Sequence, residues 1–236
     1  MATFAHSPRS RAGTGRDAAP AIEVRGLTRR FRGAAVLQRI DLTIGRGERA
    51  GVWGPNGSGK TTLLRCLAGT LTPSEGHALV LGHPPGSREA RHALGVCLGQ
   101  ERAFYGRLSG RENLLFAARL RMRPRHAALA VAAICDELAL GPFAGRPVER
   151  CSAGMRARLA LGRALLGQPE VILLDEPARS LDDPASQLVQ AALARRPELT
   201  VVVASPRRDD LTWCSHVIDL GGTTAQRQEA HDPAKR

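Results

Sequence analysis

The chain has 236 residues, 43% apolar and 3% aromatic, which predicts one large domain or a domain with an inserted lobe, built on an aliphatic core. No stretch approaches the roughly 18–20 apolar residues of a membrane span. Residues 1–20 lack the apolar stretch of a secretory signal and are predicted to be a disordered basic arm.

The net charge of +12 comes almost entirely from arginine. Such a charge suits nucleic acid, anionic lipid or nucleotide phosphates. The arginines are scattered, however, and no aromatic platform alternates with them, so a GC-rich coding bias explains them as well and no nucleic-acid partner is expected. The five cysteines form no C-x-x-C pair, which suits a reducing cytosol and predicts no disulfide framework or zinc site.

The first half of the predicted domain, which spans residues 21–222, alternates like a strand-rich subdomain before it turns helical. The turn GRGE separates two antiparallel strands from a third strand, which runs directly into a glycine-rich loop. The elements expected here are strands at 21–27, 36–44, 48–54 and 77–82 and a helix at 60–69.

The middle of the chain, about residues 101–166, is arginine-rich and helical in pattern. Ser109 and Glu112 have the S-x-x-E spacing of a capping box, which predicts the start of one helix. A second helix is expected over residues 152–166. This segment is therefore predicted to be an inserted α-helical lobe.

Two short apolar runs follow the lobe, at residues 171–175 and 200–205. Both are rich in β-branched residues, as buried parallel strands are. Strands that alternate with helices predict an α/β fold, whose ligand site lies at the carboxyl ends of the strands. After these strands, residues 223–236 are expected to form a polar tail.

Residues 54–61, GPNGSGKT, match G-x-x-x-x-G-K-[ST] between a predicted strand and a predicted helix. The glycines let backbone N–H groups approach phosphates closely. Lys60 is expected to reach the β- and γ-phosphates of a nucleotide, and Thr61 is expected to bind Mg²⁺.

A second acidic centre is expected wherever such a loop hydrolyses a nucleotide. Asp175 ends an apolar strand, where its carboxylate would hold Mg²⁺ directly or through water. Glu176 follows and would polarise the attacking water. A strand end with this pair is often only a solvated turn, but the preceding phosphate loop favours the functional interpretation.

These motifs together resemble the nucleotide-binding subunits of ABC transporters over roughly residues 21–222. GPNGSGKTT looks like the family's Walker A and VILLDEP like its Walker B. The signature motif, usually LSGGQ, falls on CSAGM at 151–155, and the D-loop falls on SLDD at 180–183. The sequences QERAFYGRLSGRENL and CSAGMRARLALGRALL are similar to those of the exporter-type branch, whose members pair with ABC-2 membrane subunits.

The resemblance implies a P-loop NTPase core with a mostly parallel sheet, an antiparallel β subdomain and the inserted helical lobe. It assigns catalysis to Glu176 and Gln100, and Mg²⁺ binding to Thr61, Gln100 and Asp175. Phe31 resembles the aromatic residue that stacks on adenine, although a core phenylalanine fits the same pattern. The residues that it implies for ATP binding are Phe31, Gly54, Pro55, Asn56, Gly57, Ser58, Gly59, Lys60, Thr61, Thr62, Ser152, Ala153, Gly154 and Asp182.

The resemblance also implies partners. ATP would lie between Walker A of one subunit and the signature helix of a second ATP-binding subunit, identical or different. There Ser152 and Gly154 would cap the γ-phosphate, although Ala153 replaces a glycine and Met155 a glutamine. The segment after Gln100 and the helical lobe would grip an integral membrane transporter subunit. The chain would then be a peripheral protein at the cytoplasmic face of the cell membrane.

One position departs from the family pattern. The strand at 200–205 should end in a histidine that contacts the γ-phosphate, but the next residue is Pro206. Proline has no side-chain donor and no N–H. His216 lies too far along the chain to replace it and is expected to be a surface or core histidine. Three accounts remain: Glu176 alone sustains slow turnover, a different subunit completes the site, or Arg207 holds the γ-phosphate.

The leading hypothesis is therefore the ATP-hydrolysing subunit of an ABC exporter for a polysaccharide, lipid, drug or heme-type substrate. A regulatory cassette that binds ATP with little turnover is an alternative that Pro206 keeps open. A soluble ABC-type ATPase acting on nucleic acid is a second alternative, which the charge would suit. Proteins of that kind usually carry two cassettes or a long coiled-coil insertion, and this sequence has neither.

Overall fold

The computed structural model describes residues 19–99, 104–221 and 226–229. Its strands are β1 (Ile22–Phe31), β2 (Ala34–Ile44), β3 (Arg49–Trp53), β4 (Glu75–Val80), β5 (Leu94–Cys97), β6 (Val171–Asp175), β7 (Thr200–Ser205), β8 (His216–Asp219) and β9 (Gln226–Glu229). Its α-helices are α1 (Lys60–Leu67), α2 (Arg88–Ala93), α3 (Gly110–Arg119), α4 (Pro124–Glu137), α5 (Gly141–Ala144), α6 (Ala153–Leu165) and α7 (Asp183–Ala194), and two short 3-10 turns are η1 (Val148–Arg150) and η2 (Asp209–Leu211).

The larger sheet of the described chain has the strand order β5-β6-β7-β3-β8-β9. Its first five strands run parallel, and β9 pairs antiparallel with β8. All of β7 is buried, because Val201 and Val203 face one hydrophobic core while Val202 and Ala204 face the other. Burial on both faces explains why this strand reads as a continuous apolar run.

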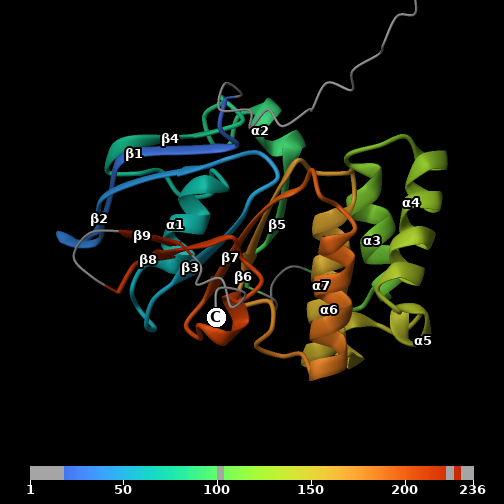
Figure 1. Cartoon of the computed structure of the whole chain (residues 1–236). Coiled ribbons are helices and arrows are strands. Elements are labelled where there is room, and N and C mark those ends of the chain that lie inside the picture. The colour runs from blue at the N-terminus through green and yellow to red at the C-terminus, as the bar shows by residue number, and fades with distance from the viewer. Residues whose placement is uncertain (1–18, 100–103, 222–225, 230–236) are drawn as a thin grey trace, which may run out of the picture.

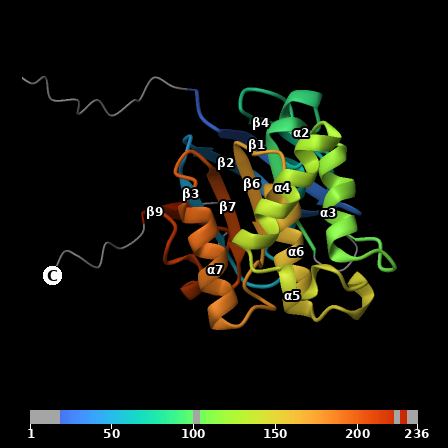
Figure 2. The ribbon, with the colours of Figure 1, turned by 90° about the vertical axis from the view of Figure 1, so that its right-hand side faces the viewer.

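Two layers cover the two faces of this sheet. The antiparallel sheet β2-β1-β4 and helix α1 lie over one face, as Figure 1 shows. Helices α3 to α7 lie on the other side and come to the front in Figure 2. The predicted α/β fold, with an antiparallel subdomain and a helical lobe, is confirmed.

Local sequence explains where several helices begin. Ser109 caps α3, since its Oγ accepts a hydrogen bond from the N–H of Glu112 while the Glu112 carboxylate accepts from the N–H of Ser109. This confirms the predicted capping box. Gly59 precedes α1 with φ of 97°, a left-handed conformation that favours glycine.

Some boundaries and elements differ from the sequence prediction. The strand expected at 77–82 runs from 75 to 80, because Leu81 and Gly82 have φ of 53° and 80° and cannot continue it. The short elements α2 and β5, the helix α7 and the strand β9 were not predicted. The predicted arm at 1–20 and tail at 223–236 lie mostly outside the described residues. Within the described residues, no helix is long and apolar enough to cross a membrane.

Candidate functional site

Three loops meet at the carboxyl edge of the larger sheet. They follow β3, β6 and β7, which are neighbours in the order β6-β7-β3. The register pairs Trp53 with Ser205 and Asp175 with Ala204, so the three strands end level with one another. The phosphate loop, the acidic pair and Pro206 therefore share one site, where a parallel α/β sheet is expected to bind its ligand.

The loop at 54–59 has the backbone of a phosphate cradle. A β-carbon on Gly54 would lie 2.5 Å from Ser58 Oγ, and one on Gly59 would lie 2.7 Å from Leu37 Cδ2. Gly57 has φ of 85°. Only glycine fits these positions without strain, and the exposed rim of Pro55, Asn56 and Gly57 leaves the backbone open to a ligand.

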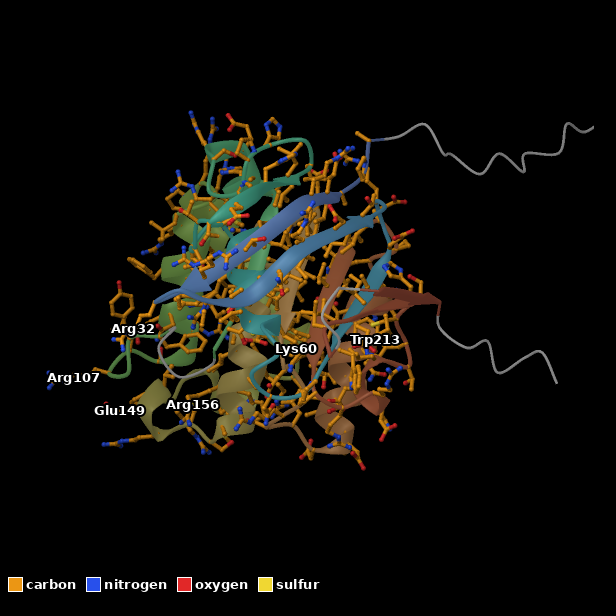
Figure 3. All side chains as sticks on the ribbon, turned by 90° about the vertical axis from the view of Figure 1, so that its left-hand side faces the viewer. Arg32, Lys60, Arg107, Glu149, Arg156 and Trp213 are labelled. Atoms are coloured by element: carbon orange, nitrogen blue, oxygen red, sulfur yellow. The ribbon has the colours of Figure 1, made fainter. Side chains whose placement is uncertain are left out.

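Lys60 is held inside this loop. Its ammonium donates hydrogen bonds to the carbonyl oxygens of Gly54 at 2.7 Å and Pro55 at 3.0 Å, and the residue is 5% exposed. Burial lowers the pKa of Lys60, although the negative charges of Glu176 and Asp175 offset part of the effect. Figure 3 shows Lys60 below the β1–β2 pair. This arrangement places a cation where phosphate oxygens would bind.

Thr61 and Asp175, the two described residues that the sequence predicts to bind Mg²⁺, contact each other. The Thr61 hydroxyl donates to Asp175 Oδ2 at 2.7 Å, while Oδ1 of Asp175 is buried and has no hydrogen-bond partner among the described residues. Burial raises the pKa of Asp175, and the charge of Glu176 raises it further. A buried carboxylate oxygen without a partner beside a hydroxyl fits Mg²⁺, which is usually held by one or two protein groups, substrate phosphates and water.

Glu176 has an unusual backbone at this edge. Its φ is 48°, a left-handed conformation that a glutamate seldom adopts, and its N–H donates to the carbonyl of Ala204 at 2.8 Å. Its carboxylate accepts a hydrogen bond from Arg179 at 3.3 Å. Strained residues persist where their surroundings fix them, and they cluster at functional sites.

The end of β7 is organised without a histidine. The Pro206 carbonyl accepts a hydrogen bond from Trp53 Nε1 at 3.1 Å, and Ser205 Oγ donates to Asp210 Oδ2 at 2.6 Å. Arg207 Nε lies 3.9 Å from Asp210 Oδ1. His216 is buried at the amino end of β8, with Nδ1 3.8 Å from Glu48 Oε2. It therefore lies at the opposite edge of the sheet, and of the two predicted roles, a surface or a core histidine, its burial fits the second.

The start of α6 presents the signature residues to the surface. Ser152 Oγ accepts a hydrogen bond from the Met155 N–H at 3.2 Å, while Met155 Sδ accepts from the Ser152 N–H at 3.5 Å. Ser152 and Ala153 are exposed. Methionine thus supplies the capping acceptor that glutamine would supply, and the helix N-terminus stays available for a negative charge.

The D-loop lies directly beside this helix start. A β-carbon on Gly154 would be 2.8 Å from the carbonyl oxygen of Ser180. Asp182, in the same loop, caps α7 by accepting a hydrogen bond from the Ala185 N–H at 2.9 Å. The predicted contact residues of a second subunit therefore belong to one surface.

Of the remaining predicted residues, Phe31 and Thr62 lie within the described residues. Phe31 ends β1 and is 42% exposed, with the Arg29 guanidinium 4.5 Å from its ring centroid, so it is not the core residue that the alternative interpretation required. Thr62 follows Thr61 in the first turn of α1 and is half-buried. Gln100 lies outside the described residues. The contact of Trp53 with Pro206 was not predicted, because the two residues are far apart in the sequence. The contact of Arg179 with Glu176 was not predicted either.

Comparisons with known proteins agree with this geometry. A family model described as "ABC transporter" matches residues 37–179. The phosphonates import ATP-binding protein PhnC of Anaeromyxobacter dehalogenans is 36% identical over 207 residues, covering 81% of this chain and 42% of that protein. The daunorubicin resistance ATP-binding protein DrrA3 of Streptomyces coeruleorubidus is 40% identical over 166 residues, covering 69% and 52%. The chain thus spans about half the length of these two relatives.

A solved structure gives the same fold. The dimeric, post-hydrolysis state of the ATP-binding cassette MJ0796, bound to ADP and Pi, superposes with a TM-score of 0.82 at 21% identity. The match covers 89% of this chain and 99% of that one.

Proposed function

The chain belongs to the ABC transporter family of ATP-binding proteins, whose cassettes hydrolyse ATP to power transport, and on that premise we propose that it is the motor subunit of an exporter. The observation that carries the proposal is the meeting of Lys60, Asp175 and Glu176 at one sheet edge. Export, rather than import, is supported by the likeness to a daunorubicin resistance protein, although a phosphonate importer is also similar.

In the proposed reaction, the phosphate loop and Lys60 bind the β- and γ-phosphates of ATP. Thr61 and Asp175 hold Mg²⁺, which neutralises charge on the phosphates when it is bound. Glu176 orients and polarises the attacking water. Ser152, Gly154 and Asp182 of a second ATP-binding subunit complete the site, and their position on one exposed surface supports this role.

A groove on the helical lobe suits the membrane subunit. A cavity of about 550 Å³ lies between β5, α3 and α6. Tyr105 and Phe116 meet edge to face at its rim, with centroids 5.3 Å apart, and both rings are exposed. Leu120 is 72% exposed beside them. Exposed aromatic and apolar side chains around a hollow are typical of protein interaction sites.

Two equally exposed leucines provide the test of this docking site. Leu120 lines the groove, whereas Leu129 on α4, 71% exposed, lies outside it. Leu120→Asp should lower the fraction of the chain that sediments with membranes containing its transporter subunit, and Leu129→Asp should leave it unchanged. Equal losses in the two variants would contradict the assignment of the groove.

Pro206 supports a second candidate function, an ATP-binding regulatory cassette with little turnover. The test is steady-state ATP hydrolysis with Mg²⁺ by the wild type and Pro206→His, with ATP binding measured in both. Slow wild-type turnover that rises roughly tenfold or more in Pro206→His supports the motor. Turnover in Pro206→His alone supports the regulatory cassette, and turnover in neither, despite ATP binding, contradicts the proposed motor.

A further inference from the structure

The tryptophan before the phosphate loop contacts the segment that carries Pro206. Trp53 is the last residue of β3, and its indole N–H donates to the Pro206 carbonyl at 3.1 Å. Because Pro206 has neither an N–H nor a polar side chain, its carbonyl is the group by which this residue can be held through a hydrogen bond. The indole therefore fixes the backbone at the position where the family has its histidine.

The Trp53 ring has further close neighbours besides Pro206. The Arg208 guanidinium lies 4.0 Å from the ring centroid and is 3.3 Å from Asp219 Oδ2. A β-carbon on Gly221 would lie 3.3 Å from Trp53 Cζ3 and 3.5 Å from Pro55 Cδ. The ring thus lies among residues 206–208, the residues that follow β8 and the phosphate loop.

The same backbone also holds the catalytic glutamate. Ala204, two residues before Pro206, accepts the hydrogen bond from the Glu176 N–H at 2.8 Å. Glu176 has φ of 48°, so its conformation depends on neighbours that fix it. A shift of the β7 end would be passed directly to this residue.

We propose that Trp53 is a positioning residue for Glu176, acting through residues 204–206 of the β7 end. This inference rests on the proposed ATP hydrolysis at this site. It explains how a chain with proline where the family has a histidine keeps its catalytic carboxylate in place: the polar contact comes from the strand before the phosphate loop. Trp53 contacts no substrate atom in this role.

Kinetics of the full chain provide the first test. Trp53→Phe keeps an aromatic ring beside Arg208 but removes the N–H donor. The kcat for ATP should fall about 3- to 10-fold, as expected for one lost hydrogen bond. The KM should stay within about twofold, because the phosphate loop itself is unchanged. Ser215→Ala is the control, since it removes a side-chain donor to a carbonyl, that of Arg49 at 3.0 Å, at the opposite edge of the sheet, and its kcat should stay near the wild-type value.

Fluorescence provides a readout that does not require turnover. The chain has two tryptophans, so Trp213→Phe leaves Trp53 as the sole indole and Trp53→Phe leaves Trp213. Added Mg-ATP should change the emission of Trp53 and leave that of Trp213 nearly unchanged. If the wild type binds ATP without hydrolysing it, the proposed motor fails, while a response of Trp53 still supports the coupling of this residue to the site.

The proposal is overturned if Trp53→Phe has the wild-type kcat, or if only its KM changes. It is also overturned if Mg-ATP does not change the emission of Trp53. Arg208→Met guards against a folding defect in Trp53→Phe, since it weakens the same packing from the exposed side. The kcat of Arg208→Met should fall less than that of Trp53→Phe, and its KM should stay near the wild-type value. A wild-type kcat in a folded Arg208→Met protein would also count against the proposal.

Discussion

Gly154, in the signature motif, should not tolerate even a methyl group. A β-carbon there would lie 2.8 Å from the Ser180 carbonyl oxygen, a contact that real β-carbons essentially never make. The obstacle is backbone rather than a flexible side chain, so the D-loop must move. Overpacking of this kind costs about 1–3 kcal/mol of folding free energy. For a domain of this size, each kcal/mol lowers the melting temperature by about 2–4 °C.

The matched control for Gly154→Ala is Ala153→Gly, one residue earlier in the same turn. Ala153 is exposed, and the change to glycine costs at most about 1 kcal/mol in helix propensity. The melting temperature and the rate of ATP hydrolysis should both fall in Gly154→Ala. The ATP affinity of the isolated chain should stay close to wild type, because the phosphate loop is unchanged. A Gly154→Ala protein as stable and as active as Ala153→Gly would contradict the predicted clash with the D-loop.

Two further predictions concern the phosphate site and the adenine. Burial raises the pKa of Asp175, so its negative charge destabilises the nucleotide-free fold at pH values above that pKa. Asp175→Asn should therefore raise the melting temperature at pH 7, and this gain should disappear as the pH falls toward about 4. The same variant should lose Mg-dependent hydrolysis. Melting curves between pH 4 and 8 check this, and an unchanging difference would contradict it. Phe31→Ala should weaken ATP binding about fivefold or more through lost stacking, with Phe31→Tyr near wild type. Competition by tripolyphosphate, which has no base, should be equal in all three proteins.

Much of the site could be predicted because its signals are local. GPNGSGKTT carries its glycines and lysine in one uninterrupted loop, and Asp175 ends a strand that is apolar throughout. Both predictions needed only residues that are neighbours in the sequence, as a motif in the first case and an apolar run in the second. The capping box at Ser109 was equally readable, since both of its hydrogen bonds join residues three apart.

Contacts between distant residues could not be predicted in this way. Trp53 and Pro206 are 153 positions apart, and only the parallel register of β3 and β7 brings them together. The approach of Gly154 to Ser180 likewise depends on how α6 packs beside the D-loop. Short elements such as β5, with four residues, were missed because so few residues show no clear period.

Hydrolysis by this cassette is proposed to depend on Glu176, although Pro206 stands where the family has a histidine. The direct test is steady-state release of phosphate from Mg-ATP by the wild type and Glu176→Gln at saturating ATP, with bound nucleotide quantified in both. We expect slow wild-type turnover, a loss of about 10²- to 10⁴-fold in Glu176→Gln, and equal ATP binding. Equal turnover in the two proteins, with ATP bound to each, would contradict the claim.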